Sequence, residues 1–130
     1  MKLDPDGKVE THFDEAATIA KEEGLSRMIV FNNQGLNLAR TNPDRAIERY
    51  TEALQMQERL ALPHDRPIVA ALHHNLGAAH YKNQDYAEAE KSFRQAEEIR
   101  RKLFEDVNHP DRQRTVEWLK AVERKLIKTN

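Results

Sequence analysis

The six histidines of this chain are its most versatile side chains, because a neutral imidazole can bind a metal ion or carry a proton. His73 and His80 lie on one face of a helical pattern, but Gly77 stands between them where a third ligand would lie. The chain has no cysteine, and no Asp or Glu completes the set at zinc-ligand spacing. We therefore expect these histidines to lie in the core or at its boundary. We expect the protein to bind neither a metal ion nor another cofactor.

Nucleophilic catalysis requires a serine, cysteine or similar group placed beside a base. Ser26 and Ser92 are the only serines, and neither stands in a nucleophile elbow. The chain also lacks a glycine-rich loop that could hold a phosphate group. The sequence contains no catalytic constellation, so we expect a protein that is not an enzyme.

Two asparagines offer a different chemistry, because a side-chain amide both donates and accepts hydrogen bonds. Asn33 and Asn75 each stand two residues before a glycine, in segments that resemble each other. Amides at such places can pair with the backbone of an extended peptide. They can also bond only to neighbouring helices, and the sequence leaves both roles open.

Length and charge narrow the class of protein. A chain of 130 residues corresponds to one domain. The formal net charge is -1, whereas general nucleic-acid binders usually carry a strong basic excess, so we expect no nucleic-acid partner. No apolar run approaches the roughly 18 residues of a membrane span, so we expect no membrane partner either. The lack of cysteine is compatible with a reducing cytoplasm, which is the location we expect.

The spacing of apolar residues predicts an all-α chain of about six helices. Residues 1–10 contain the turn-forming run Asp4-Pro5-Asp6-Gly7 and are predicted to be a flexible lead-in. Gly24 is expected to stop a first helix that covers residues 11–24. The other expected helices cover residues 26–40, 43–60, 67–82, 86–106 and 111–128.

The chain repeats itself. Ala46-x-x-x-Tyr50-x-x-Ala53 recurs as Ala89-x-x-x-Phe93-x-x-Ala96, 43 positions later. Gly35 and Gly77 repeat at an offset of 42. Self-similarity at such a period indicates a solenoid, in which helical hairpins stack on one another. The small residues then stand where two helices of a hairpin must touch.

These residues resemble the tetratricopeptide repeat family, which places an aromatic residue, Leu-Gly and a second aromatic on one helix and Ala-x-x-x-Phe on the next. The first repeat has Phe31, Gln34, Gly35, Leu38, Ala46 and Tyr50 at these positions, and the second has His73, Leu76, Gly77, His80, Ala89 and Phe93. The long period, with its His-Pro-Asp linker, looks like the kinesin-light-chain-type subclass.

The resemblance implies a right-handed superhelical stack of antiparallel helix hairpins, as one domain over residues 11–130. Its predicted parts are an N-terminal helix (11–24), a first repeat (26–62), a second repeat (66–107) and a C-terminal capping helix (110–128).

The resemblance also implies a protein-interaction module, in which the first helices of the repeats line a concave groove for a peptide or a partner's helix. By this likeness the groove comprises Ile29, Asn32, Asn33, Leu36, Ala39, Arg40, Ala71, His74, Asn75, Ala78, Tyr81 and Lys82. Members that bind a terminal carboxylate use lysine and asparagine at places that hold Asn32 and Leu36 here, so we do not expect that mode. The alternative is self-assembly, with the same helix faces forming a homodimer.

Overall fold

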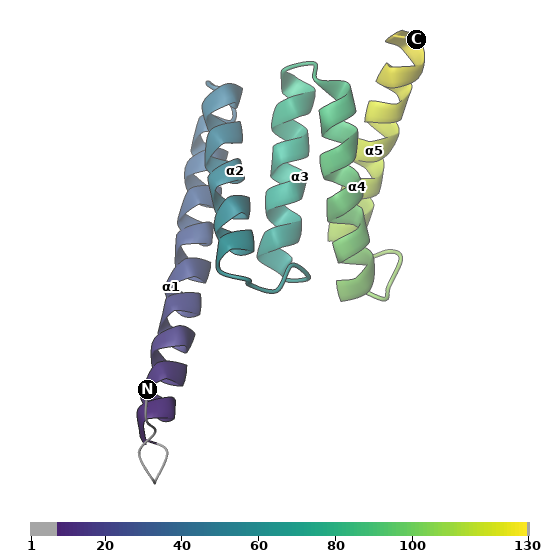
Figure 1. The fold of residues 1–130 in the computed structure, drawn as a ribbon. Coiled ribbons are helices and arrows are strands. Elements are labelled where there is room, and N and C mark those ends of the chain that lie inside the picture. The colour runs from purple at the N-terminus through teal and green to yellow at the C-terminus, as the bar shows by residue number, and fades with distance from the viewer. Residues whose placement is uncertain (1–7, 130) are drawn as a thin grey trace.

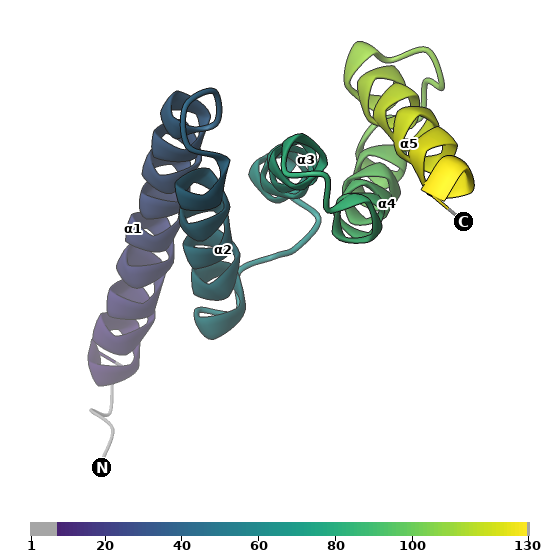
Figure 2. The same ribbon diagram turned by 90° about the horizontal axis from the view of Figure 1, so that it is seen from above.

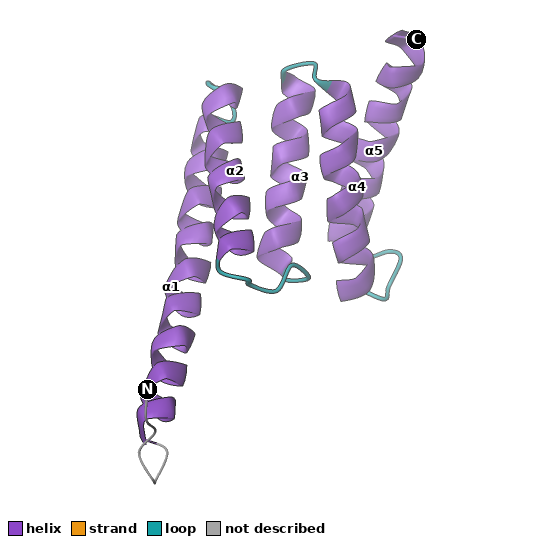
Figure 3. Ribbon diagram, in the orientation of Figure 1, coloured by secondary structure: helices purple, strands orange, loops and turns teal. Residues whose placement is uncertain are grey.

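The computed structural model describes residues 8–129, with side chains over residues 15–128. Over this range the chain forms five helices and no strand. The helices are α1 (Lys8–Leu38), α2 (Pro43–Arg59), α3 (Pro67–Lys82), α4 (Tyr86–Leu103) and α5 (Pro110–Thr129). They stand side by side in a row, and successive helices run in opposite directions (Figure 1). Figure 3 shows the same view coloured by secondary structure. Residues 1–7 of the predicted lead-in lie outside the described part, and residues 8–10 already belong to α1.

The first helix is longer than expected. α1 continues through Gly24 for 31 residues, so the predicted stop at that glycine, and with it the count of about six helices, is wrong. Gly24 is buried, and a Cβ atom there would collide with the Cδ1 methyl of Leu60, just past the end of α2. The glycine therefore admits a neighbouring side chain. That contact offsets the roughly 1 kcal/mol that a glycine costs inside a helix.

Local signals place the other helix starts. α2, α3 and α5 each begin with a proline, whose fixed φ suits the first helical position and which lacks the N–H that would be unpaired there. The Asn42 side chain caps α2 by accepting a hydrogen bond of 3.2 Å from the backbone N–H of Arg45. α4 ends at Leu103, three residues before the expected end.

The helices zigzag when the row is seen from above (Figure 2), and each packs on the next one in the chain. The hairpin-opening helices also meet, because α3 touches both α1 and α5. The N-terminal half of α1 extends past the end of α2 (Figure 1), and its side chains at residues 15–23 are exposed. No helix in the described range has the length and apolar character that crossing a membrane requires.

A glycine and an aromatic ring form the same contact in both repeats. The Tyr50 ring packs on Gly35, and the Phe93 ring packs on Gly77 so closely that a Cβ would lie 2.9 Å from Cδ1. The repeat residues of the second helices are fully buried: Ala46, Tyr50, Ala53, Ala89, Phe93 and Ala96. The predicted all-α stack of antiparallel hairpins is confirmed, and it fixes the surface between α1, α3 and α5.

Candidate interaction groove

A cavity of about 470 Å³ lies between α1, α3 and α5, and we call it the groove pocket. Seven of the residues predicted for the groove line it: Leu36, Ala39, Arg40, Asn75, Ala78, Tyr81 and Lys82. The other lining residues are Tyr50, Ala79, Gln84, Tyr86 and Trp118. The predicted stripes of two separate repeats therefore meet at one concave place.

Aromatic rings form one wall of the groove pocket. Tyr81 meets Tyr86 edge to face at a centroid distance of 5.3 Å, and it meets Trp118 at 5.3 Å in the same manner. Trp118 in turn stacks on Phe93 at 5.4 Å, which ties this wall to the core. A wall of packed rings offers a large, rigid apolar contact surface.

A second cavity, of about 360 Å³, adjoins the first and shares Tyr81 and Trp118 with it. Its remaining lining residues are Arg114, Glu117 and Ala121 of α5. Together the two cavities form a surface that runs from the end of α1 to α5, which we call the interaction groove.

Asn75 uses one of its amide hydrogens to join two helices. Its Nδ2 donates a hydrogen bond of 2.8 Å to Oδ1 of Asn32 on α1, and Asn32 is only 8% exposed. The bond to a neighbouring helix, one of the two roles left open by the sequence, is therefore present. The side chain of Asn33 is exposed and lines neither cavity of the interaction groove.

His74 does not lie on the groove surface, contrary to its predicted place. It is 7% exposed, its Nδ1 lies 3.1 Å from Oγ1 of Thr115 on α5, and its ring meets Phe93 edge to face. Burial, the largest cause, together with the positive charges of Arg100 and Arg114 lowers its pKa to about 4, against a smaller opposing effect of Asp111. His74 repeats the position of Asn32, and both point into the seam between successive hairpins instead of into the groove.

Lys82 closes the exposed end of α1. Its ammonium group donates hydrogen bonds to the backbone carbonyls of Ala39, at 3.2 Å, and Arg40, at 2.7 Å. A cation at a helix C-terminus also favours the negative end of the helix dipole. The Arg40 side chain is exposed, and it makes no hydrogen bond or ion pair with any described residue. Of the remaining predicted residues, Ile29 is exposed and Ala71 is half-buried, and neither lines the groove.

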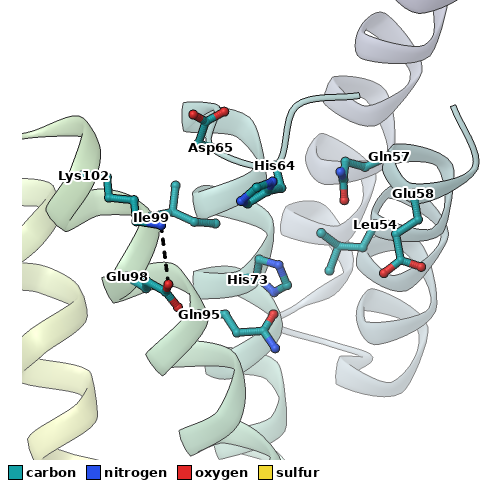
Figure 4. Close-up of a pocket in the computed structure, with 10 residues that line it drawn as sticks. All are labelled: Leu54, Gln57, Glu58, His64, Asp65, His73, Gln95, Glu98, Ile99 and Lys102. Carbon is teal, nitrogen blue, oxygen red and sulfur yellow. Dashed lines mark ion pairs between the residues drawn. The ribbon is translucent and has the colours of Figure 1, made fainter. Parts of the chain in front are cut away.

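Another cavity, of about 370 Å³, lies between α2 and α4 over α3 (Figure 4). Most of its lining residues are polar, but Leu54 and Ile99 are apolar: Leu54, Gln57, Glu58, His64, Asp65, His73, Gln95, Glu98, Ile99 and Lys102. Burial lowers the pKa of His73 to about 4, and Glu98 pairs with Lys102 at 3.5 Å. Within the described residues no three His, Cys, Asp or Glu side chains gather to hold a metal ion.

Sequence reasoning missed five residues that line the groove pocket, three of them aromatic: Tyr50, Tyr86 and Trp118. Tyr50 belongs to the core pattern of α2, and Trp118 was assigned only to a capping helix, yet both line the groove pocket. Tryptophan beside an apolar stripe was the available signal for Trp118, since large aromatic residues gather at binding surfaces.

The tetratricopeptide repeat family model matches residues 27–102, which is more than half of the chain. Comparison with curated proteins and with solved structures gave no match. The matched range covers both Gly–aromatic contacts, and it includes α2, α3, nearly all of α4 and the C-terminal part of α1. The chain belongs to the tetratricopeptide repeat family.

Proposed function

We propose that this chain holds an extended peptide or a helix of a partner protein in the interaction groove. Tetratricopeptide repeats generally mediate protein–protein interactions and are generally not catalytic. The observation that carries the proposal is the aromatic wall of Tyr81, Tyr86 and Trp118, which is half-buried against the core and lines the groove pocket with its remaining surface. Aromatic residues in such surroundings dominate the energy of protein interfaces.

The groove is held in shape before any partner arrives. The Asn75–Asn32 bond joins α3 to α1, and Lys82 bonds to the end of α1. Trp118 is fixed by its stacking on Phe93. Because these walls are already ordered, the partner bears most of the ordering entropy on binding.

A carboxylate placed in the groove pocket tests this proposal. Ala78 lines the pocket, so Ala78→Glu should abolish capture of partner proteins from a lysate of the source organism. The matched control is Ala87→Glu, the same change at an exposed position of α4 outside the groove. Circular dichroism should show equal helicity in both variants. Prey proteins captured equally by both variants and the wild type would place the binding surface elsewhere.

A second candidate is self-assembly through α1. Ile19, Ile29 and Val30 are 54%, 48% and 50% exposed, which is high for large aliphatic side chains. Light scattering across a range of protein concentrations would show a mass that rises toward that of a dimer. Val30→Glu should then restore the monomer mass, whereas a constant monomer mass in the wild type would remove this candidate.

The repeat period supports membership of the long-period, kinesin-light-chain-type subclass, which we also propose. Gly35 and Gly77, which make the same contact with an aromatic ring, stand 42 positions apart, compared with the usual period of about 34 in this family. The lengths of α2 and α4, with 17 and 18 residues, account for part of that excess.

A further inference from the structure

The hydroxyl group of Tyr50 has no hydrogen-bond partner among the described residues. Tyr50 is 0% exposed, and its Oη is buried without a hydrogen bond, although the residue lines the groove pocket. Burial raises the pKa of Tyr50 to about 12, so the group remains protonated and is a donor at neutral pH. A buried donor without an acceptor is costly, and most buried polar groups in proteins are paired.

The fold itself does not require this hydroxyl. The second repeat has Phe93 at the equivalent place, where the same ring packs on Gly77 as the Tyr50 ring packs on Gly35. Both rings are fully buried. Phenylalanine at this position therefore satisfies the packing, and the hydroxyl of Tyr50 is an additional polar group on a residue that lines the groove pocket.

The groove pocket carries positive charge and no negative charge. Arg40 and Lys82 line it, and none of its lining residues is Asp or Glu. Arg40 has no partner within the described residues, whereas Lys82 bonds to carbonyl groups and retains its charge. The charges that line the adjoining cavity balance each other, since Arg114 and Glu117 both line it. The end of the groove beside Tyr50 thus favours an anionic group.

We propose that the groove pocket recognises an acidic side chain, glutamate or aspartate, within a peptide segment of the partner. Its carboxylate accepts a hydrogen bond from the Tyr50 hydroxyl and lies in the field of Arg40 and Lys82. An apolar neighbour in the same segment packs on Tyr81 and Trp118. The hydroxyl is covered in the free protein, so lining side chains change rotamer as the carboxylate enters, as is common at interfaces. This inference rests on the proposed function and names its ligand.

A random dodecapeptide library displayed on phage and selected on the whole chain provides the probe. Enriched peptides should share an Asp or Glu beside an apolar residue. Calorimetry should show that Tyr50→Phe weakens binding roughly ten-fold or more, the effect of losing a hydrogen bond to a charged acceptor. The melting temperature of the free variant should rise, because the unpaired donor is gone. Tyr86→Phe, which removes another hydroxyl from the same pocket lining, is the control and should change binding less than about three-fold.

The peptide itself supplies a second measurement that needs no protein variant. Replacing its acidic residue with Gln should weaken binding, and replacing it with Leu should weaken binding more. Gln keeps a hydrogen-bond acceptor without the charge, whereas Leu keeps neither. Peptides that bind the wild type and not Ala78→Glu, but show no acidic preference or bind Tyr50→Phe equally well, would overturn this inference alone. No enriched peptide, or equal binding to Ala78→Glu, would overturn the groove proposal as well.

Discussion

The amide Nδ2 of Asn75 lies 2.8 Å from Oδ1 of Asn32 and joins the opening helices of two successive repeats. Asn32 is 8% exposed, so water cannot readily replace this donor. The bond therefore couples the position of α3 to that of α1, and with it the two sides of the groove pocket. An amide pair in this position is part of the scaffold as well as part of the groove lining.

Removing either amide should destabilise the protein and leave the other one unpaired. We expect Asn32→Ala and Asn75→Ala each to lower the free energy of unfolding by about 1–3 kcal/mol. The double variant should cost little more than one single variant, because the two residues share one interaction. Urea unfolding measures all three, with exposed Asn33→Ala as a control expected within about 0.5 kcal/mol of wild type. Strictly additive losses would show that the bond contributes no coupling.

Because of the Gly–aromatic contacts, replacing either glycine with alanine should destabilise the protein, although the same change in an open helix usually stabilises it. Gly35→Ala and Gly77→Ala should lower the free energy of unfolding by about 1–3 kcal/mol, because the new Cβ collides with Tyr50 or Phe93. A glycine replaced by alanine in an open helix gains stability instead. Gly24→Ala is the matched control and should cost less, since it meets the end of a flexible leucine. Denaturant unfolding measures the stability of the three variants. A gain of stability in all three would contradict the expected collisions.

Local signals in the sequence were sufficient for most helix boundaries. The prolines at the starts of α2, α3 and α5 act through their own ring geometry, so no distant residue can change their effect. Gly24 is different, because a glycine can end a helix or admit a neighbour. Which of the two occurs depends on Leu60, whose approach across 36 positions is a property of the packed structure.

The site was predicted less completely than the fold. Helical periodicity placed Asn75 and Tyr81 on the correct side of α3, but it placed the adjacent His74 there as well. One residue changes the direction of a side chain by about 100°, and only the crossing of α3 with α5 decides which direction is buried. Tyr50 and Trp118 were missed because they reach the groove from helices outside the predicted stripes.

The C-terminal helix is tied to the second repeat through a buried hydroxyl. Thr115 is 0% exposed, and its Oγ1 accepts a hydrogen bond of 2.8 Å from Nη1 of Arg100. We expect Thr115→Val, which keeps the shape and removes the hydroxyl, to lower the free energy of unfolding by about 1–3 kcal/mol. Thr115→Ser keeps the hydroxyl and should cost less. Fluorescence of Trp118, the sole tryptophan, reports the docking of α5 during unfolding. A larger loss for serine than for valine would show that the methyl group matters more than the bond.

Burial of His74 predicts a loss of stability in mild acid. Its pKa falls from 6.5 to about 4 in the folded chain, so the unfolded chain binds the extra proton between these values. Stability from this group is therefore complete above about pH 6.5 and is lost as the pH falls toward 4. Between pH 7 and pH 5 this amounts to about 2 kcal/mol for one such histidine, and His73, whose pKa is also lowered to about 4, acts in the same direction.

His74→Asn tests this assignment, because the first repeat already has an asparagine, Asn32, at the equivalent position. The variant should be less stable at pH 7, since it loses the ring contacts with Phe93 and Trp118. Its free energy of unfolding should nevertheless fall less steeply from pH 7 to pH 5 than that of the wild type. Urea titrations at both pH values measure the two slopes, with His64→Asn in the exposed linker as the control. If His74→Asn kept the wild-type slope, the acid sensitivity would belong to other groups and His74 would not be held neutral by its burial.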